Sequence, residues 1–138
     1  MTAYIDADGL VLGRLATNIA KRIMKGENVV VVNAEKAIIT GSKDDIMERY
    51  KHKKSVGSSR KGPYYSRMPH MMLKRTVRGM VPRNQPSGRL AMKRLIVHIS
   101  VPEELKGQKF EKIKNASEIR TAKYMRLGEV AKLLGAKF

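Results

Sequence analysis

Cysteine is absent from the 138 residues of the chain. The sequence therefore has neither a disulfide framework nor a thiolate metal site, which fits a reducing compartment. Long apolar runs are also absent, since the longest, residues 29–32, is far short of the roughly 20 residues that a membrane-spanning helix needs. The first residues include Asp6 and Asp8 and lack the positive segment of a signal peptide. We therefore expect a soluble cytoplasmic protein with no membrane partner.

Acidic residues are missing from a long central tract. Between Glu48 and Glu103, 54 consecutive residues hold 14 Lys or Arg and all three histidines, but no Asp or Glu. A folded surface normally mixes both signs of charge, because like charges repel as the chain compacts. Residues 43–94 carry a net charge of +12, against +1 for residues 1–42 and +4 for residues 95–138. This regional charge predicts a docking face for nucleic acid, an acidic membrane surface or an acidic protein.

Hydropathy patterning predicts a βαβ unit near the start of the chain. Residues 4–7 favour a short strand. Apolar residues recur at spacings of three and four over residues 12–24, which is typical of an amphipathic helix, and Gly26 is placed to cap its C-terminus. The four valines at 29–32 predict a strand buried on both faces, as in a parallel sheet. A strand, a helix and a buried strand within about 30 residues predict a right-handed crossover.

The rest of the chain predicts further short elements and basic loops. They are a strand over residues 37–40, a helix over 43–54 with Ser42 as its N-cap, a helix beginning at Pro69, a helix over 89–94, a strand over 95–101 and a last helix from Leu127 to Leu134. Residues 55–62 and 84–88 have the composition of loops. At this length we expect one domain over residues 1–138, large enough to bury a core.

Nucleotide, metal and catalytic sites each have a simpler explanation. Gly9 and Gly13 lie between a strand and a helix, but their spacing matches neither G-x-G-x-x-G nor the Walker loop, so a turn and close strand–helix packing explain them better. His52, His70 and His98 are widely separated, and no cysteine or nearby acid completes a zinc set. The acids cluster toward both ends of the chain, away from the histidines. We therefore expect no catalytic residue, metal, cofactor or small-molecule substrate.

The central tract, approximately residues 49–94, has the composition of an RNA-binding extension. Arg and Lys neutralise phosphates, glycine and proline let the backbone approach a phosphodiester chain, and tyrosine and arginine planes stack on exposed bases. RNA is preferred over DNA because no zinc finger, basic zipper or clear helix-turn-helix is readable. The expected RNA contacts are Lys53, Lys54, Arg60, Lys61, Tyr64, Tyr65, Arg67, Lys74, Arg75, Arg78, Arg83, Arg89, Lys93 and Arg94.

Five segments, in fixed order along nearly the whole chain, resemble one known family. They are DADGLVLGRLA at residues 6–16, the segment 29–41 with VVNAEK inside it, GPYY at 62–65, VRGMVP at 77–82 and LGEVA at 127–131. Together they are similar to the universal large-subunit ribosomal protein family thirteen. The compact length and residues 89–101 are similar to its archaeal branch, which is related to the eukaryotic thirteen-a proteins.

The resemblance implies a fold and a role. The implied fold is α/β, with three α/β/α layers, a central mixed or mostly parallel sheet and the basic RNA-binding extension. The implied role is that of a structural constituent of the large ribosomal subunit, which binds its ribosomal RNA, supports assembly, contacts neighbouring ribosomal proteins and catalyses nothing. Two alternatives remain from the residues alone: a small nucleotide-binding enzyme built on the βαβ unit, and a DNA-compacting protein.

Overall fold

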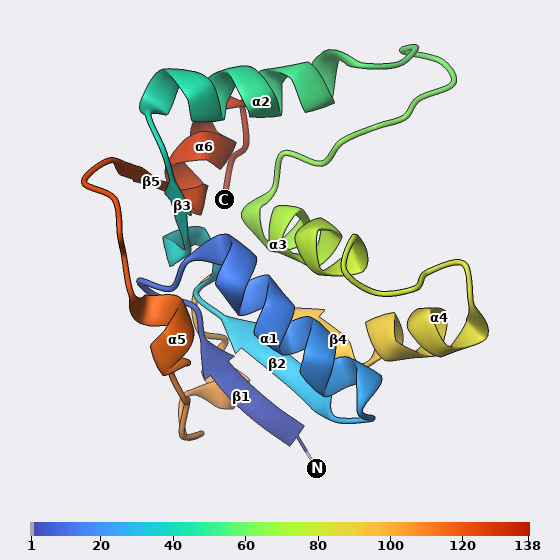
Figure 1. Cartoon of the computed structure of the whole chain (residues 1–138), viewed down its shortest axis with the longest axis vertical. Helices are drawn as coiled ribbons and strands as arrows, with labels where there is room; N and C mark the ends of the chain where they lie inside the picture. The colour runs from blue at the N-terminus through green and yellow to red at the C-terminus, as the bar shows by residue number, and fades with distance from the viewer. Residues whose placement is uncertain (1) are drawn as a thin grey trace.

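Three parallel strands form the main sheet (Figure 1). The structure is a computed structural model that describes residues 2–138. In spatial order the strands are β1 (Thr2–Asp6), β2 (Asn28–Val32) and β4 (Leu95–Val97). All four valines of the central strand are buried, as the uninterrupted apolar run predicted.

Helix α1 (Leu12–Met24) joins β1 to β2 and completes the predicted βαβ unit. Its buried side chains follow the predicted helical spacing: Leu12, Leu15, Ala16, Ile19, Ala20 and Ile23. Gly26 follows the C-cap with a φ of 99°, a left-handed conformation that glycine adopts without a Cβ clash. Met24 was predicted to lie on the apolar face and is instead 39 % exposed. The close packing predicted at Gly13 is also wrong, because a Cβ there would meet open space.

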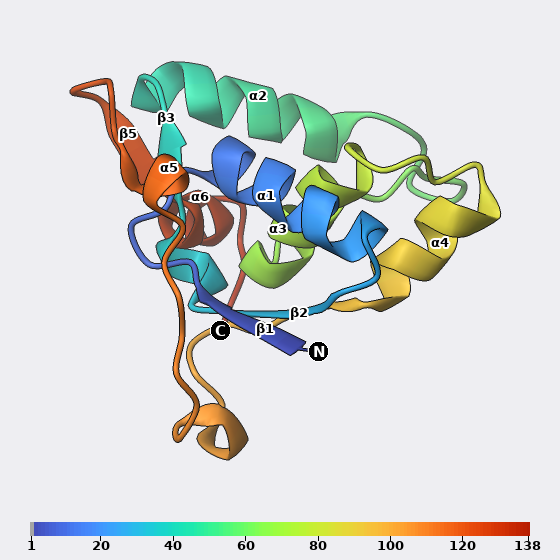
Figure 2. The same ribbon diagram turned by 60° about the horizontal axis from the view of Figure 1, so that its bottom comes forward.

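The two faces of the parallel sheet are covered differently. Ile5, Val31 and Val97 lie opposite one another across the strands and point into the core, under α1 and α3 (Pro69–Arg78). On the second face the Tyr4 ring meets Phe110 edge-on, with 6.2 Å between centroids. Figure 2 shows the helices on one side of β1 and β2 and the short segment η2 (Glu103–Leu105) on the other. The predicted α/β fold with a mostly parallel sheet is confirmed.

A second, two-stranded sheet lies beside the first. Strand β3 (Ile38–Thr40) pairs antiparallel with β5 (Tyr124–Arg126), which runs directly into α6 (Leu127–Leu133). The strand at residues 37–40 and the last helix were predicted, whereas β5 was not. The start of α6 packs on η1 (Ala34–Lys36) so closely that a Cβ at Gly128 would lie 2.9 Å from a backbone oxygen there.

The acid-free tract contributes to the body of the protein. Helix α2 (Lys43–Ser55) begins as predicted, with the Ser42 hydroxyl accepting a hydrogen bond from a backbone N–H at 3.3 Å. A loop over residues 56–68 leads from α2 to α3, as the green segment of Figure 1 shows. Met72, Leu73 and Val77 of α3 are fully buried in the core. Residues 49–94 are therefore not a detached extension, because α3 packs against α1.

Two boundaries in the later part of the chain differ from those predicted. Helix α4 (Pro86–Lys93) begins where a loop was expected, since Pro86 can occupy the first helical turn. Strand β4 ends at Val97, and the chain then turns at Ser100, whose backbone has a φ of 59°. A short helix, α5 (Lys114–Ser117), precedes β5. Between residues 2 and 138, none of the helices is both long and apolar enough to cross a bilayer.

Candidate nucleic-acid interface

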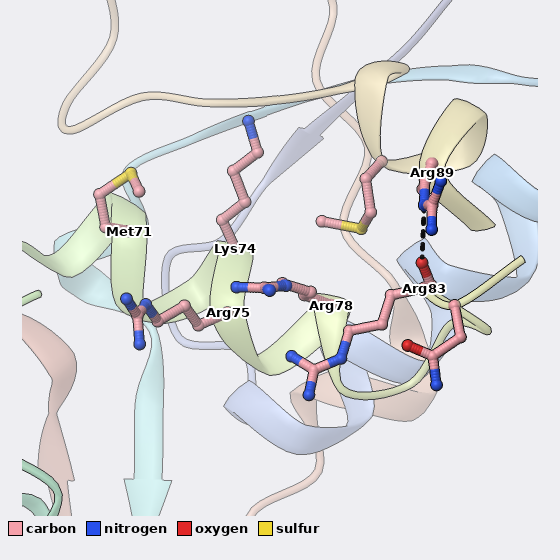
Figure 3. A pocket seen from close by; sticks show the side chains of 8 residues that line it. Met71, Lys74, Arg75, Arg78, Arg83 and Arg89 are labelled. Carbon is pink, nitrogen blue, oxygen red and sulfur yellow. Dashed lines mark hydrogen bonds between the residues drawn. The ribbon is translucent and has the colours of Figure 1, made fainter. Parts of the chain in front are cut away.

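A groove with a volume of about 630 Å³ lies between α3 and α4. Figure 3 shows the positive side chains that line it, which come from α3, from α4 and from the connection between them. They are Lys74, Arg75, Arg78, Arg83 and Arg89. All five were among the predicted RNA contacts, and no acidic residue lines the groove. The structure thus brings five residues spread over sixteen positions of sequence onto one concave surface, which we call the basic groove.

Two of the five side chains are fixed by hydrogen bonds to backbone carbonyls. Arg75 donates from Nη2 to the Tyr64 carbonyl at 2.6 Å, and Arg89 donates from Nε to the Arg83 carbonyl at 3.3 Å. Carbonyl groups orient a guanidinium without cancelling its charge, and each guanidinium has further N–H donors to offer. The basic groove is therefore partly pre-organised for an anion.

Close backbone packing holds the two sides of the basic groove together. Gly88, in the first turns of α4, is buried against the preceding connection. A Cβ at this position would lie 2.1 Å from the Pro82 carbonyl oxygen, a distance that no real contact allows. Only glycine permits this approach, which places Arg89 of α4 beside Arg83 of the connection.

No ion pair neutralises the acid-free tract. The ion pairs found among residues 2–138 join Arg14 to Glu118, Arg22 to Glu111, Arg120 to Glu118 and Arg126 to Asp8. All four lie outside residues 49–102, so the charge of the tract is left for a partner outside the chain.

The rings of Tyr50 and Tyr65 connect the loop 56–68 to α2. The Tyr65 ring lies 6.2 Å from the buried Tyr50 ring of α2, and Lys53 is 5.0 and 5.5 Å from the centroids of Tyr50 and Tyr65. Burial raises the pKa of Tyr50 to about 12, with a further rise from Tyr65 that Arg49 partly opposes. Burial also raises the pKa of Tyr65. Tyr65, predicted as a base-stacking residue, is half-buried, and its ring already contacts the tilted Tyr50 ring and Lys53 within the protein.

Three further predicted RNA contacts lie at the C-terminal ends of helices. Lys54 donates to the Leu134 carbonyl at 2.5 Å and Arg94 to the Ile23 carbonyl at 2.9 Å, so each caps a helix of the body. The Arg67 guanidinium lies near Gly135, where a Cβ would be 3.2 Å away from it. These contacts give the three side chains a structural role, whatever they bind in addition.

The other predicted contacts are exposed. Arg60, Lys61 and Lys93 are all on the surface. Tyr64 is 61 % exposed, although its hydroxyl donates to the Ser59 carbonyl at 2.9 Å. Of the two tyrosines, Tyr64 therefore has the ring surface that is free for a base.

The comparisons with known proteins agree on one family. The family model described as "Ribosomal protein L13" matches residues 1–104. The chain belongs to the ribosomal protein L13 family. This matched part includes α3, α4 and β4, so the basic groove lies inside the region shared with the L13 family.

Archaeal members of the L13 family are similar over almost their whole length. "Large ribosomal subunit protein uL13" of Archaeoglobus fulgidus is 54 % identical over 134 residues, covering 95 % of this chain and 86 % of that protein. The protein of the same name from Methanosphaera stadtmanae is 46 % identical over the full length of both chains. That of Methanocaldococcus jannaschii is also 46 % identical, over 97 % of this chain and 98 % of its own. The predicted family and its archaeal type are confirmed.

The histidines of the acid-free tract lie in different environments. His52 is exposed on α2, but His70 is half-buried at the start of α3, and its Nδ1 is buried without a hydrogen-bond partner. Burial, His98 and Lys74 all lower the pKa of His70. No cluster of three His, Cys, Asp or Glu side chains suited to a metal ion occurs within residues 2–138.

Sequence reasoning missed the uncharged part of the basic groove. Met71, Asn84 and Met92 also line it. Met71 and Met92 lie in the helices that flank the groove, and Asn84 lies in the connection between them. Their residue types carry no signal of their own, because methionine in a helix normally belongs to a core and asparagine to a turn.

Proposed function

We propose that the chain is a structural constituent of the large ribosomal subunit, where it binds large-subunit ribosomal RNA and supports assembly. Family membership supports this role, since the similar archaeal proteins are named as large-subunit proteins. The role is that of a binding protein in the cytoplasmic ribosome, beside neighbouring ribosomal proteins, and not that of an enzyme. The single observation that carries the proposal at the level of residues is the basic groove, with five positive side chains and no acid.

Within this function the tract divides into three kinds of contact. Lys74, Arg75, Arg78, Arg83 and Arg89 bind phosphates in the basic groove. Arg60, Lys61 and Tyr64 extend the RNA-binding surface along the loop 56–68, where they are exposed. Lys93 adds an exposed charge at the end of α4. The remaining predicted residues contact other parts of the protein and thereby support this surface: Lys53, Lys54, Tyr65, Arg67 and Arg94. We infer that residues 1–138 act as one domain, because α3 of the tract shares the core of the βαβ unit.

Binding across a salt series tests the proposal. Purified large-subunit ribosomal RNA and duplex DNA of equal length are titrated with the wild-type protein and with a double variant, Arg78→Ala with Arg83→Ala. We expect a clear preference for the RNA. Each lost phosphate contact flattens the log–log dependence of affinity on salt by about 0.7 to 0.9, so the variant's slope should be roughly one and a half units shallower.

The matched control removes the same charge elsewhere. Lys106 and Lys109 are exposed, lie near η2 and make no ion pair. Lys106→Ala with Lys109→Ala should leave the salt slope for ribosomal RNA closer to that of the wild type. Equal affinity for RNA and DNA, or equal slopes for the two double variants, would reduce the tract to a generic polycation and would favour the DNA-compacting alternative.

A further inference from the structure

The basic groove is concave, and a concave basic surface suits a different RNA shape from a flat one. We propose that it takes a single unstacked nucleotide together with its flanking phosphates, so that the RNA at this point is a bulge or a loop and not a continuous duplex. The inference rests on the proposed RNA-binding function and names the class of RNA structure that the groove recognises. A volume of about 630 Å³ lies within the roughly 300–1,000 Å³ range of sites that enclose small ligands.

The charge of the basic groove favours phosphates that lie close together. Five positive side chains face one hollow, and none has an acidic partner. A regular duplex presents its phosphates on a convex surface, where they approach a groove one strand at a time. A strand that turns sharply to extrude a nucleotide brings successive phosphates toward one point. Such a turn offers more negative charge to Lys74, Arg78 and Arg83 than a straight backbone does.

The uncharged residues that line the basic groove favour contact with a base. Met71 on α3 is 38 % exposed, and Met92 on α4 is half-buried, so two thioether side chains border the hollow from opposite helices. Phosphates gain nothing from such contacts, whereas the face of an unstacked base is apolar and polarisable. Asn84 adds both a donor and an acceptor, the pair of groups that reads the edge of a base.

The fixed arginines orient the nucleotide. Arg75 is held by the Tyr64 carbonyl, 2.6 Å from its Nη2, and Arg89 by the Arg83 carbonyl. Figure 3 shows these two side chains on opposite sides of Arg78, at the two ends of the basic groove. A phosphate on each side of the extruded nucleotide would meet one fixed guanidinium. The guanidinium groups of Arg78 and Arg83 make no hydrogen bond within residues 2–138, so they can adapt to the RNA.

Three short RNAs of equal charge test the inference. They are a perfect duplex, a duplex with a one-nucleotide bulge, and the same bulged duplex with an abasic site at the bulge. The perfect duplex carries a one-nucleotide overhang at one end, so that all three have the same number of phosphates. Each competes with labelled large-subunit ribosomal RNA for the full-length protein at one salt concentration. We expect the bulged RNA to compete about tenfold more strongly than the duplex, as burying one base face against apolar side chains predicts. The abasic bulge should fall between them.

Two variants assign the effect to the basic groove. Met71→Ala changes no charge and removes an exposed side chain. With this variant the bulged RNA should compete only as strongly as the abasic bulge, and the salt slope should not change. Arg78→Ala with Arg83→Ala should abolish the advantage of both bulges over the duplex. Lys106→Ala with Lys109→Ala should preserve the wild-type order of the three RNAs.

The outcomes separate this inference from the proposed function. If large-subunit RNA binds but the three short RNAs compete equally, or none competes, the nucleotide site is overturned and the RNA-binding role stands. An unchanged order in Met71→Ala would also overturn the base contact. If the large-subunit RNA itself shows no preference over duplex DNA, the proposed function fails first.

Discussion

The guanidinium of Arg75 lies over the ring of Tyr65, with its central carbon 5.1 Å from the ring centroid. The same guanidinium donates to the carbonyl of the preceding residue, Tyr64, at 2.6 Å. On α2, the ammonium group of Lys53 approaches the Tyr65 ring at 5.5 Å. Through Tyr64 and Tyr65 the loop 56–68 is thereby attached both to α3 and to α2, and an arginine of the basic groove is one of the attachments.

Replacing Arg75 by lysine should loosen this loop while keeping the charge. A lysine cannot both stack as a plane on Tyr65 and donate in a fixed direction to the Tyr64 carbonyl. We expect faster amide hydrogen exchange over residues 57–67 in Arg75→Lys than in the wild type. Arg78→Lys, which changes an exposed arginine of the same helix, is the control and should leave this exchange unchanged. Equal exchange in the two variants would contradict the attachment.

Alanine variants of the neighbours Arg94 and Lys93 should affect different properties, the first stability and the second RNA binding. Arg94 caps α1 through the Ile23 carbonyl at 2.9 Å, so Arg94→Ala should lower the free energy of unfolding by about 1 kcal/mol. Lys93 is exposed, so Lys93→Ala should leave stability unchanged and weaken RNA binding. Urea denaturation measures the first effect, and titration with large-subunit RNA measures the second. A stable Arg94→Ala protein would disprove the cap.

Gly88→Ala should disturb the basic groove from behind. The added Cβ would lie 2.1 Å from the Pro82 carbonyl oxygen, so α4 or the connection must move. We expect a loss of about 1–3 kcal/mol in stability, as overpacking generally causes, together with weaker RNA binding. Gly107→Ala is the matched control, because its Cβ would meet nothing within 4 Å. Thermal unfolding of the two variants, measured side by side, shows whether Gly88→Ala lowers stability more than Gly107→Ala does.

Alkaline pH should destabilise the fold through Tyr50. Its pKa is raised to about 12 in the folded protein, mainly by burial, whereas the unfolded chain releases this proton near pH 10. Above pH 10 the unfolded state therefore holds fewer protons than the folded state, and the free energy of unfolding falls as pH rises toward 12. The difference between the two pKa values corresponds to a loss of roughly 2–3 kcal/mol in the free energy of unfolding near pH 12.

Tyr50→Phe isolates this contribution. It removes the titrating hydroxyl and keeps the ring that packs against Tyr65. Denaturant unfolding between pH 8 and 11.5 should show a smaller loss of stability in Tyr50→Phe than in the wild type. Parallel pH profiles for the two proteins would show that Tyr50 ionises normally.

Local patterns predicted the elements whose signals are strong and short in range. The stripe of α1, the valines of β2 and the Ser42 cap were all found because each depends on neighbours within a few positions. Strand β5 was missed because only three residues form it, and its partner β3 lies far back in the sequence. Helix α4 was predicted to begin too late because Pro86 and Gly88 resemble a loop, although Gly88 is required by packing against Pro82.

The charge argument found the cations of the basic groove but could not assign their roles. It placed Arg78 and Arg94 in one class, since both are arginines in an acid-free tract. The structure leaves Arg78 at the groove and uses Arg94 to cap a helix that ends 70 positions earlier. Contacts between residues so far apart in sequence depend on the packing of α1 against its neighbours, which no local pattern encodes.

The topology of the parallel sheet has a consequence for the order in which the protein and its RNA come together. The acid-free tract begins inside α2, which follows β3, and it includes β4, which pairs with β2. Both ends of the tract are therefore anchored in the folded body, so part of its configurational entropy is already lost before any RNA arrives. A free cationic tail would lose that entropy on binding. This chain can therefore present its charges at fixed separations from the first encounter.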